Sequence, residues 1–363
     1  ELAVDAGRRN KRAFIAGLTA SFAVLIAGNL GTVKMLWQGL QRLVAPGGNI
    51  DGARLFEHLK WAAAGLGKFV TGTRLPYGTG DWYWNPSRAI PGEVITEFPF
   101  FTFTYADLHA HMIALPITLL VLGWAISMLL RKEDWKNAIA SKGWVPLLGS
   151  LLFGGLIIGM LRPTNTWDLP TYLLFSAVVV FYSIWRYAEV PARFFSRSPQ
   201  WFRRLAFCTL AIAILVGMAL IFFLPFSQKY GQAYGSIESW KGDKTHLGAY
   251  LTHWGWQLFL IISWLVWETR EWLAATPASA IKRIKPYQGY LLVVGMLFAA
   301  VLILLTMLGV KIGWLVGIAG VWALILILRP NQPDVKRLVL FMVGTGLVLT
   351  LFVELFALTG DIG

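Results

Sequence analysis

The sequence predicts an all-α, polytopic integral membrane protein, and three observations lead to that prediction. Of its 363 residues, 56% are apolar and 14% are charged, whereas a soluble domain has about 45–50% and about 25%. The mean hydropathy is +0.60. Apolar runs also recur along the chain, each near the length of about 20 residues that a helix needs to cross a bilayer. Together these exclude a soluble enzyme, a disordered chain and a collagen, and the single cysteine, Cys208, excludes a disulfide scaffold.

Nine runs are long and apolar enough to be considered as membrane spans, although the third and eighth are short and the first also suits an interfacial helix. The nine predicted spans are roughly 13–31, 110–130, 145–161, 169–187, 205–225, 247–267, 289–308, 312–328 and 338–356.

The charge distribution predicts the orientation of these spans. If the N-terminus lies inside the cell, the inside segments hold 20 of the 32 Lys and Arg residues, and seven of the remaining 12 lie in the single long loop 32–109. Short cytoplasmic loops of membrane proteins are enriched in cations. We therefore expect a multi-pass protein of the plasma membrane with a cytoplasmic N-terminus and an extracytoplasmic C-terminal end. The net charge of +13 then reflects orientation next to anionic lipids, and nucleic acid is not expected as a partner.

Three parts follow from this topology. Residues 1–31 form an N-terminal segment with the first span, residues 32–109 form a long extracytoplasmic loop, and residues 110–363 form the transmembrane helix bundle. Within the loop, residues 53–70 suit a short amphipathic helix on the membrane surface. The aromatic run from Trp82 to Trp84 suits either the headgroup level or stacking against sugar rings.

Polar residues gather at the predicted outer face, where they are candidates for a functional site. They lie at the end of the long loop, between spans three and four, after span five and in span nine, and they include Glu97, Asp107, His109, His111, Arg162, Asn165, Asp168, His246 and Glu354. Glu354 is the most costly of them, because a carboxylate within a span usually needs a partner. His253, in a Trp-rich span, is either a hydrogen-bonded polar residue or a pigment ligand.

Several of these residues also have a purely structural interpretation. Asp107 completes a possible capping box with Thr104 at the start of the second span. Asp168, two residues before Pro170, suits the N-cap of the fourth span. Arg162 either extends to the lipid headgroups or holds a phosphate with its fork of donors.

A divalent metal is a possible cofactor at the same edge. Asp107 and His111 are separated by four residues and would share one face of a helix, and His109 lies between them. Carboxylate and imidazole groups are common metal ligands, although two or three ligands at this spacing form a weak signal. Asp107, His109 and His111 are therefore the tentative metal ligands.

Specific strings in these outer segments resemble the "YYY" family of uncharacterised polytopic membrane proteins from archaea and Chloroflexi-type bacteria. They are WNPSR at 84–88, ITEFPFFTF at 95–103, DLHAH at 107–111 and TNTWDLPTY at 164–172, together with the Gly28–Asn29–Leu30 and Pro225–Phe226 steps. The resemblance covers the whole chain. Members of that family begin with a further membrane region that this chain lacks, so we expect the chain to be part of a longer protein.

The resemblance extends to the GT-C superfamily of glycosyltransferases, and it implies a similar fold and activity. By this analogy, the protein transfers sugar from a lipid-phosphate carrier, such as a polyprenyl phosphate, at the extracytoplasmic face. Asp107 or Glu97 would act as the general base. Arg88, Arg162, Asn165, Trp167 and Asp168 would bind the substrate, with an arginine or the metal stabilising the departing phosphate.

A second function remains open from the sequence. The 18 Trp residues and the glycine-bearing spans also suit a non-catalytic subunit of a larger respiratory or photosynthetic membrane complex. Copurifying subunits or pigment would favour this alternative, whereas a bound lipid phosphate or metal would favour the enzyme. Membrane lipids are expected partners in both cases.

Overall fold

The computed structural model describes residues 2–90, 95–106, 108–137, 144–190, 197–230 and 236–359. The described residues are mainly helical, as expected for an all-α membrane protein. By its internal contacts the chain divides into two compact units, which are described separately below. Unit 1 is Glu1–Asp107, Trp240–Trp322 and Leu347–Leu355, and unit 2 is Leu108–Ser239, Ala323–Gly346 and Phe356–Gly363.

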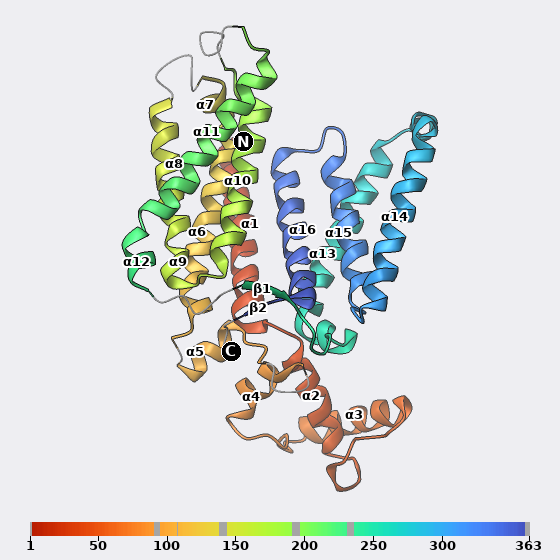
Figure 1. Cartoon of the computed structure of the whole chain (residues 1–363). Helices are drawn as coiled ribbons and strands as arrows, with labels where there is room; N and C mark the ends of the chain where they lie inside the picture. The colour runs from red at the N-terminus through yellow and green to blue at the C-terminus, as the bar shows by residue number, and fades with distance from the viewer. Residues whose placement is uncertain are drawn as a thin grey trace. The chain divides into compact units, whose positions relative to one another are not determined.

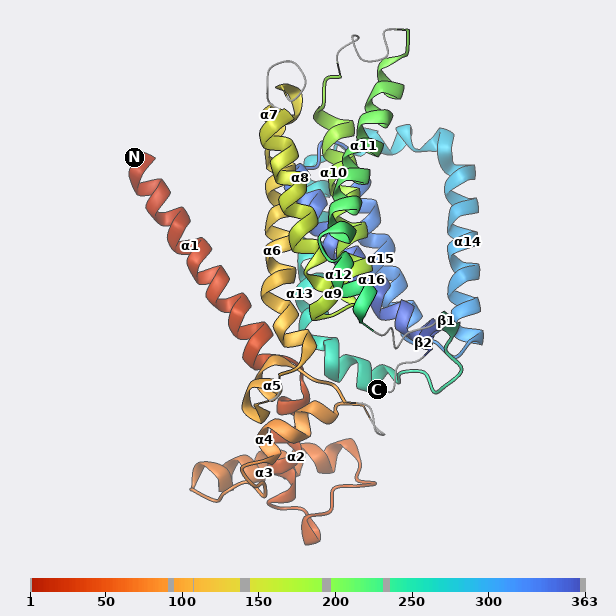
Figure 2. The same ribbon diagram turned by 60° about the vertical axis from the view of Figure 1, so that its left-hand side comes forward.

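The N-terminal helix of unit 1 is long and has few contacts with the rest of its unit. Helix α1 (Leu2–Phe22) continues as a short π-helix, η1 (Ala23–Ala27), and ends at Gly28, whose φ is 49°. Figure 2 shows it as one rod that extends away from the small helices that follow it. The side chains described in it, from Asn10 to Phe22, are exposed, and they include apolar ones such as Phe14, which is 66% exposed. That exposure is expected of a helix surrounded by lipid.

The predicted extracytoplasmic loop folds into a cluster of short helices in unit 1. They are α2 (Gly31–Arg42), α3 (Leu55–Val70), α4 (Asp81–Trp84), η3 (Asn85–Arg88) and α5 (Pro99–Tyr105). Helix α3 corresponds to the predicted amphipathic helix at 53–70. Its first turn is closed by the Arg54 N–H, which donates to the Glu57 carboxylate at 2.7 Å. Ala62 and Gly65 face the protein, whereas Leu55 and Phe56 are more than 70% exposed.

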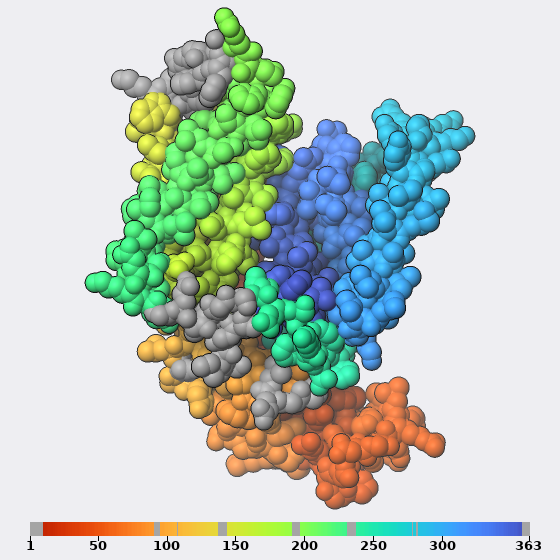
Figure 3. Space-filling model, in the orientation of Figure 1, coloured from red at the N-terminus to blue at the C-terminus, as the bar shows by residue number. Residues whose placement is uncertain are grey.

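The later helices of unit 1 come from the second half of the chain. They are α13 (Leu247–Ala275), α14 (Gln288–Met307), the first part of α15 (Gly313–Leu328) and the last part of α16 (Asp334–Leu355). In α14 only Leu302 and Leu305 are buried. Figure 3 shows the side chains of α14, in light blue, on the molecular surface. Gly317 of α15 permits close packing here, because a Cβ at that position would lie 2.9 Å from Leu302.

Unit 2 is built around a bundle of helices that lie side by side (Figure 1). These helices are α6 (Ala110–Leu130), α8 (Trp144–Gly159), α10 (Asp168–Tyr187) and α11 (Gln200–Ile221), with the short α7 (Lys132–Asn137), α9 (Leu161–Thr164) and α12 (Leu224–Lys229). Their apolar side chains form a core that also includes Leu338 of α16.

Glycines allow α8 to approach its neighbours in this bundle. A Cβ at Gly154 would lie 2.3 Å from the ring of Trp124, and one at Gly155 would lie 2.6 Å from Met218. Trp124 is held over this position by its indole N–H, which donates to the Ser150 carbonyl at 2.9 Å. Small residues are commonly used in this way where membrane helices pack closely.

A two-stranded antiparallel sheet in unit 2 was not predicted from the sequence. Strand β1 (Ser236–Ser239) pairs with β2 (Phe356–Thr359), which follows α16 directly, and Ile237 is opposite Leu358. Each strand has only four residues, which is too short for an alternating pattern to identify it in a sequence. The predicted last span, 338–356, therefore ends where this strand begins.

Seven helices of the described residues are long and apolar enough to cross a membrane. Two further predicted spans lie in helices that fall short of that standard. The segment 247–267 lies in α13, where His253 and Gln257 make the helix less apolar, and 312–328 corresponds to α15, which has 16 residues. The chain is thus a multi-pass membrane protein, and the count of nine spans stays a prediction.

Glu354, the predicted intramembrane carboxylate, has a defined partner in unit 1. Its side chain accepts a hydrogen bond from the Thr245 N–H at 3.0 Å, and its carbonyl accepts one from Lys244 Nζ at 2.5 Å. The residue is only 6% exposed. These contacts attach the segment before α13 to the end of α16.

We expect Glu354→Ala to destabilise the protein by about 1–3 kcal/mol, because it leaves the partly buried Thr245 N–H without its acceptor. Glu354→Gln retains an acceptor oxygen, so it should lower the free energy of unfolding by less than Glu354→Ala does. Thermal unfolding in detergent measures the difference, with Glu238→Ala on the exposed strand β1 as the control. Equal melting temperatures for Glu354→Ala and Glu238→Ala would show that the hydrogen bond contributes little.

Candidate functional site

A polar cavity in unit 1 is lined by three cations. It has a volume of about 340 Å³. Its lining residues come from α2, η3, α13 and the segment before α4, and they are Gly31, Lys34, Met35, Gln38, Arg42, Tyr77, Asn85, Arg88, Ala89 and Thr252. Among the described residues, no carboxylate lines it. Lysine, arginine, amide and hydroxyl groups at one cavity are suited to an anion such as a phosphate.

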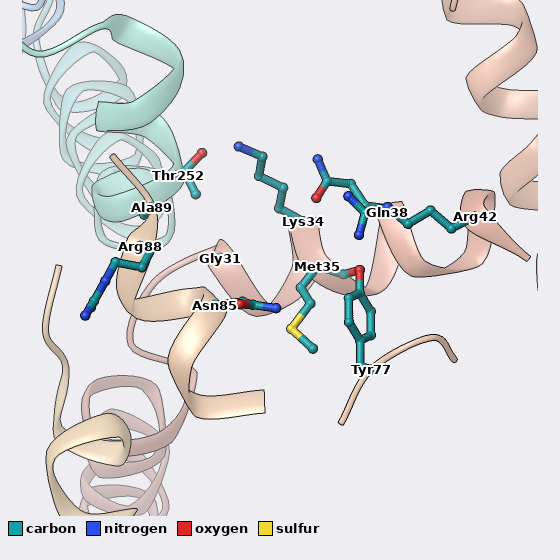
Figure 4. A pocket seen from close by; sticks show the side chains of 10 residues that line it. All are labelled: Gly31, Lys34, Met35, Gln38, Arg42, Tyr77, Asn85, Arg88, Ala89 and Thr252. Atoms are coloured by element: carbon teal, nitrogen blue, oxygen red, sulfur yellow. The ribbon is translucent and has the colours of Figure 1, made fainter. Parts of the chain in front are cut away.

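Helix α2 supplies the polar wall because its polar residues recur every four positions. Lys34, Gln38 and Arg42 are spaced i, i+4 and i+8, which places them on one helix face. Figure 4 shows Lys34 and Gln38 on the same side of α2, with Lys34 directed toward Thr252 of α13. The cavity thus depends on how α2 is fixed relative to α13 and η3.

The segment Gly28–Gly31 fixes that position. Leu30 N–H donates to the Thr252 carbonyl at 2.7 Å, and Gln257 donates to the Gly28 carbonyl at 3.0 Å. Asn29 is 4% exposed, and its amide donates to the Pro86 carbonyl of η3 at 2.9 Å. The Asn29 side-chain oxygen accepts from the Gly31 N–H at 2.7 Å. A single buried asparagine therefore connects the start of α2 to the turn that carries Arg88.

Arg88, predicted to bind substrate, lies at the border between this cavity and an aromatic cluster. Its guanidinium lies 4.1 Å from the centroid of the Trp84 ring and donates to Ser87 Oγ at 2.7 Å. Trp84 also contacts Phe101, which stacks on Tyr105 with their rings 8° from parallel. Stacking on an aromatic face holds an arginine in place while leaving other donors available.

Tyr77 closes the cavity beside Met35. Its hydroxyl donates to the Met35 carbonyl at 2.7 Å. Burial raises the pKa of the Tyr77 phenol, although the nearby Arg42 partly opposes the shift. The phenol therefore stays protonated near neutral pH, and it acts there as a hydrogen-bond donor.

Glu97, a predicted catalytic carboxylate, follows a residue that is fixed to the Arg88 turn. Thr96 N–H donates to the Ser87 carbonyl at 2.7 Å, and the Thr96 hydroxyl accepts from the Ala89 N–H at 3.0 Å. Glu97 is half-buried. Asp107, which is the other predicted base and also a predicted metal ligand, lies outside the described residues.

The remaining predicted site residues belong to unit 2. Asn165 is 6% exposed, and its amide donates to the Asp168 carboxylate at 3.0 Å. The prediction that Asp168 is an N-cap is wrong: Asp168 is the first residue of α10, Trp167 occupies the N-cap position, and no side chain caps the helix there. The carboxylate is instead oriented by Asn165, and it still complements the positive end of the helix dipole.

His109 and His111 lie at the start of α6 in the same unit. Their rings stack with centroids 5.2 Å apart. The predicted capping box is wrong, because Thr104 lies within α5 and α6 begins at Ala110 with His109 as its N-cap residue. Helix α6 also contacts α9, which contains Arg162.

Two groups of predicted residues thus occur, with Arg88 and Glu97 in unit 1 and His109, His111, Arg162, Asn165, Trp167 and Asp168 in unit 2. Sequence reasoning missed the other cavity residues, above all Lys34, Gln38 and Arg42. Their four-residue spacing was a signal that could have identified them, but it falls in a segment read only as a long loop.

The comparisons with known proteins identify a family. A family model described as "Uncharacterized membrane protein (DUF2298)" matches residues 1–363. No curated protein and no solved structure matches the chain.

Proposed function

This chain belongs to the DUF2298 family of membrane proteins, and from that premise we propose that it is a membrane glycosyltransferase-like protein. It acts at the extracytoplasmic face on a sugar linked to a lipid phosphate. The observation that carries this proposal is the cavity lined by Lys34, Arg42 and Arg88. The similarity of the sequence strings to the "YYY" membrane proteins, and through them to the GT-C superfamily, supports the same reaction class.

The cations of the cavity stabilise the leaving group in this reaction. A carboxylate, Asp107 or Glu97, takes the proton of the acceptor hydroxyl as its oxygen bonds to the anomeric carbon. The bond between that carbon and the phosphate oxygen breaks, and the electron pair leaves with the lipid phosphate. Lys34, Arg42 and Arg88 offset the negative charge that develops on the phosphate.

The other predicted residues serve binding in this proposal. In unit 1, the aromatic face of Trp84 offers a stacking surface for a sugar ring. In unit 2, Trp167 offers another such surface, and Arg162, Asn165 and Asp168 offer polar groups for substrate hydroxyl or phosphate groups. Asp107, His109 and His111 would be the residues that hold a divalent metal, which would supply positive charge to the departing phosphate. Addition of a chelator would then abolish transfer, and the divalent ion would restore it.

The direct test is transfer of labelled sugar from a polyprenyl-phosphate donor by the full chain in neutral-lipid vesicles. We expect Arg88→Ala to lower the transfer rate by about tenfold or more, because a hydrogen bond to a charged group is worth about 1.5–3 kcal/mol. Arg74→Ala, which alters an exposed cation of the same loop, should leave the rate unchanged. Asp107→Asn or Glu97→Gln, whichever removes the general base, should abolish transfer without loss of folded protein.

Two results would contradict the proposal. One is the absence of transfer with every polyprenyl-phosphate sugar tried, and the other is an equal rate for Arg88→Ala and Arg74→Ala. The alternative is a non-catalytic subunit of a larger membrane complex, in which a partner instead of lipid would cover the exposed apolar surface of α14. Stoichiometric copurification of further subunits, without transfer activity, would support that alternative.

A further inference from the structure

An apolar groove adjoins the cationic cavity of unit 1. It has a volume of about 360 Å³ and is lined by Leu30, Val33, Lys34, Trp37, Leu251 and Thr252. Lys34 and Thr252 line both spaces. A polar, cationic space is therefore joined to an apolar one by Lys34 and Thr252.

The two spaces differ in chemistry because α2 presents two faces. Lys34, Gln38 and Arg42 follow one another at four-residue intervals, whereas Val33 and Trp37 form an adjacent apolar row with the same interval. Leu251 of α13 lies on the other side of the groove. Val33 is 59% exposed and Trp37 is 42% exposed, so apolar surface faces outward beside a charged site.

We propose that this pair of spaces binds one polyprenyl phosphate, with its phosphate at Lys34 and its hydrocarbon chain along Val33, Trp37 and Leu251. An amphiphile with an anionic head and an apolar tail matches both the charge of the cavity and the apolar lining of the groove. Burial of the chain contributes about 0.8 kcal/mol per methylene group, whereas the cations recognise the head. The identity of the lipid rests on the proposed function, but its binding is tested without any sugar transfer.

The experiment measures binding of geranylgeranyl phosphate to the full chain in neutral-lipid nanodiscs, with geranylgeraniol and inorganic phosphate as partial ligands. We expect the intact amphiphile to bind at least tenfold more tightly than either partial ligand. Val33→Asn should lower affinity for geranylgeranyl phosphate by about tenfold and leave inorganic phosphate binding unchanged. Lys34→Ala should reduce the preference for the phosphate over the alcohol.

The matched control is Val70→Asn, since Val70 is 77% exposed on α3 and lies outside both spaces. It should bind all three ligands as the unmodified protein does, and a thermal melt confirms that each variant is folded. Equal binding by Val33→Asn and Val70→Asn would overturn the inference, as would equally tight binding of phosphatidic acid. If geranylgeranyl phosphate binds as expected but no sugar is transferred, this inference stands and only the proposed transferase activity is refuted.

Discussion

Asp334→Ala is expected to destabilise unit 2 by about 3 kcal/mol. Asp334 is the first residue of α16, and its carboxylate accepts hydrogen bonds from the hydroxyls of Tyr182, at 2.5 Å, and Tyr187. Lys132 Nζ lies 3.3 Å away. The Asp334 side chain is only 14% exposed, so its removal leaves two hydroxyls without the acceptor that orients them.

The expected loss of stability comes mainly from the hydrogen bonds of the two tyrosines. A hydrogen bond to a charged group contributes about 1.5–3 kcal/mol, whereas an ion pair with an exposed lysine contributes about 0–1 kcal/mol, and the Lys132 side chain is 47% exposed. Arg337 also donates to the Tyr182 hydroxyl at 3.3 Å. Loss of the carboxylate therefore affects a network that joins α16 to α10.

Thermal unfolding in detergent checks this prediction, with Asp134→Ala as the matched control. Asp134 is 55% exposed and lies 3.8 Å from Arg131, so its loss should change stability by less than about 0.5 kcal/mol. Asp334→Asn keeps an acceptor oxygen but not the charge, so its melting temperature should lie between those of Asp334→Ala and Asp134→Ala. The proposed network would be refuted if Asp334→Ala melted at the temperature of Asp134→Ala.

The sequence was sufficient to predict most of the helices in unit 2. Runs such as 110–130 and 169–187 are uniformly apolar and close to the span length, so they correspond to α6 and α10 within a residue or two. Helix α3 was also predictable, because its apolar and polar residues alternate with the helical period. Composition and length were thus sufficient for the apolar spans, whereas α3 also required the periodicity of its residues.

The cavity was only partly predictable, because it depends on contacts between distant segments. Arg88 was identified as a substrate-binding candidate, but nothing local indicates that Asn29 reaches Pro86, or that Leu30 bonds to Thr252. The capping predictions were wrong for a more local reason. A short polar motif marks only a possible helix start; α10 begins at Asp168 itself, whose carboxylate accepts a hydrogen bond from Asn165, three residues earlier.

Gly65→Ala should destabilise unit 1 and weaken anion binding together. Gly65 of α3 packs on α2, and a Cβ at this position would lie 1.9 Å from the carbonyl oxygen of Leu40. That oxygen belongs to the backbone of the helix that carries Lys34 and Arg42, so the contact can be relieved only by moving α2 or α3. Overpacking of this kind costs about 1–3 kcal/mol, or more where the backbone must shift.

Gly67→Ala is the internal control on the same helix, because a Cβ at Gly67 meets nothing within 4 Å. Alanine is favoured over glycine within a helix by about 0.5–1 kcal/mol, and this gain is common to both variants. The difference between Gly65→Ala and Gly67→Ala in thermal unfolding therefore isolates the contact with Leu40. We expect Gly65→Ala to lower the melting temperature and Gly67→Ala to raise it. Binding of geranylgeranyl phosphate should be lost in Gly65→Ala alone. If Gly65→Ala lowers the melting temperature but binds as tightly as Gly67→Ala, the placement of α2 by α3 does not determine the cavity, and the segment Gly28–Gly31 would be its main support.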